Sequence, residues 1–527
     1  MKKFLRVSLL ITVSFLALVG WFSCCNYQIL SVNVSDFIEN RTSIRQFKSN
    51  ISKQMKSNDF FHKDEFINLN GVYGRLSGRR LYNDVVLMKN GYMTGNIHSL
   101  GLNPEIIQQK TEIIDDFSKF VEERSGHFIY VQFPRKFDME SKLMPDGYKT
   151  IVPKETEELV IAFQEAGIDV IDTLPVLSKT AADIEEYYYR TDHHWKPTAA
   201  FKAFQIIMEH LQALYPEQNY DEMITNIDNW TVHEKPEWFL GIHGKRVGEY
   251  FTGMDSMYWL TPNFETHVSL YNEKEDKLYA DDYVTAFLRE DYIQDRGNVL
   301  HKSAYLVYIG DDYSLTISRN PNAPSDQKVL IIKDSFSLPL QTFYAMIFRQ
   351  VDTIDPRHYT ATSLKEYVDR TRPDIVIMEI QGYAIINDAY FTLSNDEDIL
   401  LGDKELLLKK DFKIAAKDNK YSCTTIYKKI EKEKFYTLVI PKITITEGDP
   451  DGFTVGLFDI KKNKLISQTV FDIDYCNKYG DCEWTFEAPA TGSRDVRLVI
   501  YSGIHNQAQN IGVKFENVQL YERSLID

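Results

Sequence analysis

The sequence predicts an α/β fold with a mostly parallel sheet covered on both faces by helices, followed by a C-terminal all-β sandwich. Short apolar strands at 128–131, 329–332 and 374–379 alternate with helical patterns. Continuous apolar runs of this length are typical of parallel strands that are buried on both faces. Beyond residue 434 the hydrophobic period changes to two, with Asp-Gly, Tyr-Gly and Thr-Gly turns between short strands. This second pattern predicts the sandwich.

The composition is that of an acidic, folded protein with more than one unit. The 527 residues are 43% hydrophobic, and 76 acidic side chains outnumber 60 basic ones, for a net charge of −16. A chain of this length exceeds what one ordinary core accommodates. Because no basic block is present to replace the counterions of a phosphate backbone, the charge excludes nucleic acid as the expected partner and favours an uncharged or sparsely charged ligand.

The N-terminus predicts an export signal or membrane anchor over residues 1–30. A short basic start precedes an uncharged run from Val7 to Cys25, and the lack of a small-x-small cleavage site favours an uncleaved single-pass anchor. The basic flank stays in the cytoplasm, so we expect the rest of the chain on the extracellular or periplasmic side of the cell membrane. A lipid attached at Cys24 or its neighbour is the minor alternative. Residues 31–67 predict a stalk or a leading helix.

Residues 68–430 predict the α/β unit. Asn-Gly pairs predict an opening strand at 70–73 and a hairpin over 85–92. Residues 216–325 interrupt the alternation and predict an insertion with short strands. A hairpin between 412 and 428 is expected to close the unit. Helices are expected at 104–123, 156–166, 197–214, 338–349 and 363–372.

The stretch from Tyr187 to Trp195 contains an acid and two imidazoles in sequence, Asp192, His193 and His194. Such groups lose hydration on burial, so a fold that gathers them usually has a proton to move or a metal to bind. Metal binding is the weaker interpretation, because adjacent histidines do not easily face one ion and no further His-x-x-His or Cys pair supports a site. We therefore predict no metal and no cofactor.

Ser335 follows the buried strand 329–332 at the point where a helix begins. This is the carboxyl edge at which open α/β sheets bind ligands, and a helix N-terminus offers N–H groups to a developing oxyanion. Two interpretations are open from this stretch alone, a nucleophile or an N-cap, since serine and Asp334 both cap helices well. A serine nucleophile needs a base and a carboxylate to orient that base. Asp192 and His194 supply both.

The motif Asp192-His193-His194-Trp195, followed along the chain by a strand-end serine, resembles the DHHW protein family and the SGNH-hydrolase-like domains of the alginate O-acetyltransferase proteins. The resemblance covers roughly residues 65–430 and implies a three-layer SGNH-like sandwich. It also implies that Asp192 orients the base, that His194 is the general base, and that Ser335 is the nucleophile.

Other positions of the resemblance are less complete. The segment ending at Lys136 is similar to the family's strand-end Pro-x-Lys, which implies that Lys136 lines the site, and Glu379 matches a strand-end acid that we interpret as structural. Lys196 stands where a hydroxyl residue is often found, and Ala199 where glycine is common. The family's glycine and asparagine oxyanion blocks are not recognisable, so the backbone N–H of Ser335 is the one oxyanion donor that the resemblance implies.

We predict three contacts with the substrate, Lys136, His193 and Tyr189. A supporting role behind the site is the alternative for His193. The aromatic run 187–189 suits stacking on sugar rings, although partial burial is the other interpretation. Trp195 is expected to pack in the core behind the loop.

Residues 431–527 predict the β-sandwich, after a charged linker at 428–434. Its architecture resembles that of carbohydrate-binding modules, and a spacer or oligomerisation domain is the alternative. Trp484 is expected in its core. Cys476 and Cys482 have the spacing to bridge a short loop, whereas the number of cysteines excludes a disulfide-dense scaffold.

From the resemblance we predict an O-acyltransferase, most simply an O-acetyltransferase, that modifies a cell-surface or exported polysaccharide through an acyl-enzyme. Because acetyl-CoA stays in the cytoplasm, the resemblance implies a membrane-bound O-acyltransferase partner that passes on the acyl group. Two alternatives are open: an esterase that uses the same three residues with water as acceptor, and a glycan-binding scaffold without catalysis.

Overall fold

The computed structural model describes most of the chain. It covers residues 62–96, 103–136, 141–148, 152–275, 277–386, 400–416, 423–428, 430–448, 450, 452–462, 464–489, 495–502 and 511–526, with scattered positions before 62. Most of the predicted anchor and most of the predicted stalk thus lie outside the described residues. Within the described part of the chain, no helix combines the length and the hydropathy needed to cross a membrane.

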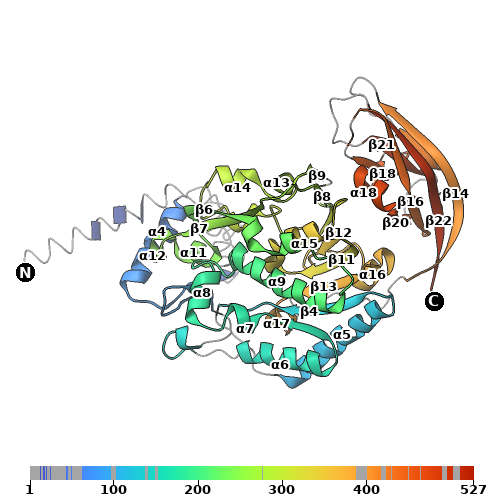
Figure 1. The fold of residues 1–527 in the computed structure, drawn as a ribbon. Coiled ribbons are helices and arrows are strands. Elements are labelled where there is room, and N and C mark those ends of the chain that lie inside the picture. Colours follow the sequence, from blue (N-terminus) through green and yellow to red (C-terminus); the bar gives the residue numbers. More distant parts are fainter. Residues whose placement is uncertain are drawn as a thin grey trace, which may run out of the picture.

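One sheet of eight strands organises the α/β unit (Figure 1). Its strands follow the order β5 (Asp169–Asp172), β4 (His127–Gln132), β13 (Ile375–Glu379), β11 (Ser325–Lys333), β12 (Phe348–Ile354), β10 (Leu315–Arg319), β8 (Val268–Asn272) and β9 (Lys277–Asp281). The first five are parallel, and the last three extend the sheet antiparallel. The predicted parallel sheet is confirmed, within a sheet that is mixed as a whole.

Helices cover both faces of this sheet, which confirms the predicted three layers. One face packs against α9 (Pro197–Leu214) and α15 (Leu340–Ile347), and the other against α5 (Pro104–Glu122), α6 (Val152–Glu165) and α16 (Leu364–Thr371). Alternate residues of a strand serve the two layers: Ile129 and Val131 join the first core, and Phe128 and Tyr130 the second. Both faces are apolar because both are covered.

The chain enters the unit through α4 (Lys63–Leu76). The strand predicted at 70–73 is therefore wrong. Its glycines permit close packing instead of a turn: a Cβ on Gly71 would lie 1.9 Å from the carbonyl oxygen of Val247, and one on Gly74 would lie 2.7 Å from the ring of Tyr82. The predicted hairpin follows, in a small sheet of β1 (Leu81–Tyr82), β2 (Val85–Leu87) and β3 (Met93–Gly95).

The predicted insertion at 216–325 is only partly separate from the sheet, because three of its strands, β8, β9 and β10, are part of the sheet. A ribbon of β6 (Trp230–Phe239) and β7 (Asp255–Pro262) stands apart, and α11 (Ile242–Val247) and α12 (Glu249–Thr252) connect its strands. The remaining helices of the unit are α7 (Leu174–Leu177), α8 (Ala181–Tyr187), α10 (Glu222–Thr225), α13 (Tyr283–Phe287), α14 (Glu290–Gln294) and α17 (Gly382–Ile386).

The C-terminal unit is a sandwich of two antiparallel sheets around one core. One contains β14 (Leu401–Ala416), β22 (Ile511–Leu525), β16 (Phe435–Ile440), β20 (Cys482–Glu487) and β17 (Lys442–Glu447), and the other β15 (Cys423–Tyr427), β21 (Val496–Ser502), β18 (Gly452–Asp459) and β19 (Lys464–Asp472). The hairpin expected to close the α/β unit at 412–428 is wrong, because β14 pairs with β22 and β15 with β21. The sandwich strands thus begin at Leu401, ahead of the charged segment 428–434.

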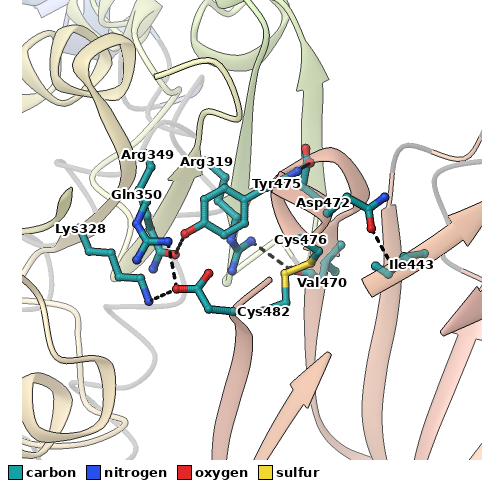
Figure 2. Close-up of a disulfide and its surroundings, with 12 residues drawn as sticks. Arg319, Lys328, Arg349, Gln350, Ile443, Val470, Asp472, Tyr475, Cys476 and Cys482 are labelled. Atoms are coloured by element: carbon teal, nitrogen blue, oxygen red, sulfur yellow. Dashed lines mark hydrogen bonds and ion pairs between the residues drawn. A yellow bond between two sulfur atoms is a disulfide. The ribbon is translucent and has the colours of Figure 1, made fainter. Parts of the chain in front are cut away.

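A disulfide-closed loop of the sandwich docks on the α/β unit (Figure 2). Cys476, in α18 (Ile473–Tyr479), is bonded to Cys482 at the start of β20. The hydroxyl of Tyr475 donates to the Gln350 side-chain oxygen at 3.0 Å. The predicted pairing of the two cysteines is confirmed, and it closes the segment that makes the contact.

The docking occurs far from Ser335. Asp481 pairs with Lys328 at 3.0 Å and with Arg349 at 2.9 Å. Lys328 lies in the amino-terminal half of β11, whereas Ser335 follows the carboxyl end of the same strand. At about 3.3 Å per residue, these positions are roughly 23 Å apart. The disulfide-closed loop therefore contacts β11 away from the end that leads to the predicted nucleophile.

Candidate active site

The turn after β11 presents the hydroxyl of Ser335. This residue begins the 3₁₀ helix η4 (Ser335–Ser337), and the N-cap of that helix is Asp334. Asp334 Oδ1 accepts the N–H of Phe336 at 2.9 Å, and its Oδ2 accepts the N–H of Gln381 at 3.1 Å. The interpretation of Ser335 as the N-cap is therefore wrong. One carboxylate caps the turn and ties it to the end of β13.

Ser335, His194 and Asp192 form a continuous hydrogen-bonded chain. His194 Nε2 lies 2.7 Å from Ser335 Oγ, and His194 Nδ1 lies 2.6 Å from Asp192 Oδ1. The carboxylate favours the tautomer with a proton on Nδ1, which leaves Nε2 to accept the hydroxyl proton. A β-bridge between Tyr188 and Trp195 closes the loop that carries the acid and the base. The structure thus brings together the three residues that were predicted as catalytic.

Asp192 is held by a segment that the sequence analysis did not identify. It is 2% exposed, and its Oδ2 accepts the N–H of Ile242 at 2.7 Å. A Cβ on Gly241 would lie 2.3 Å from the Cβ of Asp192, so only glycine permits this approach. Burial raises the pKa of Asp192, but His194, His193 and the hydrogen bonds outweigh burial and hold it well below its ordinary value. The carboxylate therefore stays ionised.

Tyr305 covers one face of the His194 ring. Its ring stacks on that of His194, with centroids 3.8 Å apart and planes 8° from parallel, and its hydroxyl donates to the carbonyl oxygen of Ser335 at 3.2 Å. Trp195 is fully buried, and its indole N–H donates to the carbonyl oxygen of Phe336 at 3.0 Å. The prediction that Trp195 packs in the core is confirmed. Both aromatic side chains tie the histidine loop to the serine turn.

A cavity of about 310 Å³ opens over Ser335. Lys136 and His193, two of the three predicted substrate contacts, line it. Lys136 is 3% exposed, and its ammonium donates to the carbonyl oxygens of Met93 at 2.9 Å and Arg190 at 3.3 Å. Burial lowers the pKa of Lys136 to about 7, against the opposing effect of nearby carboxylates. Burial therefore makes the charged form of Lys136 less favourable than in water.

Tyr189, the third predicted substrate contact, is not among the residues that line this cavity. It is 2% exposed, and its ring packs edge-on against Phe239 at 4.8 Å and Tyr305 at 6.5 Å between centroids. The prediction is wrong because the bridge that closes the loop turns this ring into the core below the site. Tyr189 supports Tyr305 instead of a sugar ring.

Two buried side chains of the cavity carry nitrogen atoms that have no hydrogen-bond partner among the described residues. His243 is 5% exposed with both ring nitrogens unpartnered, and burial lowers its pKa to about 3, so the ring is neutral. Gln381, also 5% exposed, has an unpartnered Nε2. A buried donor or acceptor without a partner costs about 1–3 kcal/mol. A substrate that supplies partners recovers this cost. Neither residue was predicted, and the position of Gln381 just after a buried strand is the one signal that the sequence contains.

The same loop is the one cluster of potential metal ligands in the described part of the chain. Ligand atoms of Asp192, His193 and His194 lie within 4.8 Å of one another. Both ring nitrogens of His194 are already hydrogen-bonded, to Asp192 and to Ser335. A metal ion bound to His194 would have to break one of these hydrogen bonds, so the arrangement fits proton transfer better than metal binding.

The comparison with protein families bears on the α/β unit. A family model described as an SGNH hydrolase-like domain, acetyltransferase AlgX, matches residues 99–234. The matched segment includes Lys136 and the Asp192–Trp195 motif and ends before Ser335. The match confirms the predicted resemblance and the SGNH-like α/β class of the unit. A search of curated protein sequences finds no match.

Solved structures similar to this chain include three from bacteria. PatB1 from Bacillus cereus shares 18% identity with a TM-score of 0.49, over 57% of this chain and 96% of its own. A DHHW family protein from Eubacterium siraeum shares 18% identity with a TM-score of 0.42, over 58% and 93%. AlgX from Pseudomonas aeruginosa shares 11% identity with a TM-score of 0.32, over 84% and 94%.

Proposed function

We propose that this chain is an O-acyltransferase that transfers an acetyl group to a hydroxyl of a cell-surface or exported polysaccharide. The observation that carries the proposal is the hydrogen-bonded chain from Asp192 through His194 to Ser335 at a cavity of about 310 Å³. The match of residues 99–234 to an acetyltransferase-type domain favours acetyl as the transferred group.

In the first half-reaction, Ser335 Oγ attacks the carbonyl carbon of the acetyl donor while His194 Nε2 takes the hydroxyl proton. Asp192 stabilises the imidazolium that forms. The developing oxyanion meets the N–H of Ser335, which as the first N–H of a helix has no intrahelical partner, and the unpartnered amide of Gln381. The carbonyl re-forms, the bond to the donor breaks, and His194 returns the proton to the leaving group.

In the second half-reaction, a sugar hydroxyl attacks the acetyl-Ser335 carbonyl while His194 again takes a proton. The bond from acetyl to Ser335 breaks, His194 protonates the serine oxygen, and the acetylated sugar leaves. The neutral His243 has both a donor and an acceptor to offer to sugar hydroxyls in the cavity. Lys136 and His193 are the proposed further contacts.

The acetyl donor follows from the expected location. We place the site outside the cell membrane, held there by an N-terminal anchor, where acetyl-CoA is not available. In this proposal a membrane-bound O-acyltransferase carries the acetyl group across the membrane and delivers it to Ser335.

Intact-mass measurement after incubation with an activated acetyl ester tests the proposal. The parent chain should gain one acetyl group, Ser335→Ala should gain none, and His194→Ala should react more slowly by a factor of about 10² to 10⁴. Decay of the adduct in water alone and with glycan then separates an esterase from a transferase, because only a transferase moves the label to glycan. A folded parent that never gains acetyl contradicts the proposal.

A further inference from the structure

A second cavity near the active site is lined by cations. It measures about 440 Å³, and Arg75, Arg79, Arg80 and Arg190 all line it. The whole chain carries a net charge of −16. Four guanidinium groups around one cavity therefore form a local positive charge in a protein that is negative overall. Within the described residues, none of the four makes an ion pair with a carboxylate. Like charges held together without a counter-ion repel one another, so the arrangement favours an anionic occupant.

Within the described part of the chain, the hydrogen bonds of each of these arginine side chains use at most one of its donors. Arg190 Nη2 donates to the carbonyl oxygen of Met254 at 2.8 Å, and Arg80 Nη1 donates to that of Met88 at 3.4 Å. A guanidinium has five N–H donors in a fixed planar fork. One carbonyl contact therefore orients the group and leaves donors for a ligand.

The two remaining arginines are also held in place. Arg75 Nη1 donates to the carbonyl oxygen of Phe251, and Arg79 lies over the rings of Tyr73 and Tyr82, at 5.4 Å and 5.2 Å from their centroids. All four side chains thus keep their charge at the cavity.

Two described acids near the cavity have other partners. Asp146 pairs with Lys89, a fifth cation of the cavity lining, at 2.7 Å. Asp255 lies beside the backbone of Arg190, but its oxygens accept the N–H groups of Arg190 and Thr191 and the hydroxyl of Thr191. The arginine side chains therefore keep their unmatched charge.

The number of guanidinium groups favours phosphate over carboxylate. A planar carboxylate is satisfied by one guanidinium in a bidentate pair, whereas a tetrahedral phosphate offers oxygens in several directions and binds two or more. Four arginines exceed the need of one carboxylate. They match the need of one phosphate.

The cavity is connected to the active site by the chain itself. Lys89, Asn90 and Gly91 of the β2–β3 hairpin line it, and the same hairpin lines the active-site cavity with Thr94 and Gly95. Arg190 precedes Asp192 by two residues, and its carbonyl oxygen accepts the ammonium of Lys136 at 3.3 Å. One extended ligand can therefore reach both cavities across the hairpin.

We propose that this arginine cavity binds a phosphate group of the acceptor glycan while a nearby sugar hydroxyl enters the cavity at Ser335. That the ligand is a glycan rests on the proposed function, whereas its phosphate is inferred from the arginines alone. The proposed acceptor is therefore a sparsely charged glycan that carries phosphate at intervals along its sugar chain.

The double variant Arg79→Gln/Arg80→Gln removes two charges from the cavity at exposed positions. Its matched control, Lys277→Gln/Arg296→Gln, removes two exposed charges elsewhere. Acetyl-enzyme formation from a small activated ester should stay within twofold of the parent in both variants, because the ester does not reach the arginine cavity. Transfer to a phosphate-bearing glycan should fall at least tenfold in kcat/KM in the arginine variant only, and transfer to a neutral glycan should not change.

Binding of inorganic phosphate to the purified full-length chain, followed by calorimetry, tests the site without catalysis. The parent and the control should bind it, and the arginine variant should lose at least tenfold in affinity. Three outcomes would overturn the proposal: no phosphate binding by the parent, an equal loss of transfer with the neutral glycan, or an equal dependence on the arginines with a uronate-bearing glycan. A parent that binds phosphate but forms no acetyl-enzyme would contradict the proposed function and leave the phosphate site standing.

Discussion

Gln381, whose side-chain amide nitrogen is unpartnered, lines the same cavity as the proposed nucleophile. Asp334 binds the backbone N–H of Gln381 and that of Phe336 at the same time, so the two strand ends keep one spacing. If the amide stabilises the oxyanion, Gln381→Ala should slow acetyl-enzyme formation by about 10² to 10³ with the melting temperature unchanged.

The variant Gln381→Glu distinguishes this role from a structural one. Its carboxylate repels an oxyanion at pH 8, whereas its protonated form can donate a hydrogen bond. The rate relative to the parent should therefore recover as the pH falls through the pKa of the new acid. A constant ratio across pH would point to a structural role.

Glu379 is a buried acid at the end of β13, and its contribution to the free energy of unfolding depends on pH. It is fully buried and accepts the hydroxyl of Tyr344 at 2.6 Å, and burial raises its pKa from 4.5 to about 7. Between these values the folded state binds a proton that the unfolded state has lost, so the contribution of Glu379 to stability falls as pH rises from 4.5 to 7. Glu379→Gln should therefore stabilise the protein more at pH 8 than at pH 5, by about 2–3 kcal/mol.

Denaturant unfolding of the parent and Glu379→Gln at the two pH values measures this difference. Glu185→Gln, on the exposed surface, serves as the control and should show no comparable dependence on pH. An equal effect of Glu379→Gln at both values would mean that the folded carboxyl titrates in its ordinary range.

The start of α11 shows how an element positions the site from a distance. Gly241→Ala places a methyl group 2.3 Å from the Cβ of Asp192, so α11 must move and the bond from the N–H of Ile242 to Asp192 is lost. We expect acetyl-enzyme formation to fall by about 10-fold to 100-fold, at a stability cost of about 1–3 kcal/mol. Ile242→Ala keeps the backbone N–H and should retain near-parental rates. If both variants behave alike, the backbone contact is not what orients Asp192.

Elements with local signals were predicted well. The strands at 128–131, 329–332 and 374–379 were found from continuous apolar runs, and α9 from Pro197 followed by apolar residues at helical spacing. Two errors came from signals that depend on distant partners. The Asn-Gly pair at 70–71 lies in α4, where Gly71 permits the close approach of the Val247 carbonyl. The strand β14 pairs with β22, about a hundred residues later.

Site residues that belong to a sequence motif were predictable. Site residues that only the fold brings to the cavity were not. Asp192, His194 and Ser335 were found by motif order and strand-end position, and they meet. Tyr189 was misassigned because an aromatic run reads the same whether a ring points to solvent or to the core. His243 has no sequence pattern, and the one signal for Gln381 is its position just after a buried strand. The unpartnered nitrogens of both side chains become visible only in the folded structure.

At the scale of the whole molecule, the contact between the two units combines polar pairs with apolar packing. Tyr271 and Leu278 of the α/β unit pack against Val470 of the sandwich. Asp481, beside the disulfide, pairs with both Lys328 and Arg349. Asp481→Asn should weaken the docking by about 1 kcal/mol, because the three side chains are partly exposed and the pair is screened. Scanning calorimetry should then show the two units unfolding at more widely separated temperatures. Asp411→Asn, which breaks a pair within the sandwich, is the control, and an unchanged separation for Asp481→Asn would contradict the expected coupling.

The strand order also determines when the site appears in time. His194 and Ser335 are 141 residues apart in sequence, and β13, made later still, lies between β4 and β11 in the sheet. At about 5–20 residues per second of synthesis, the base is made roughly 7–28 s before its serine. The parallel strands close only when β13 inserts, and pairing of such distant segments is slow. The rate at which activity returns during refolding should therefore report the insertion of β13. Formation of the histidine loop alone should give no activity and is not detected in that assay.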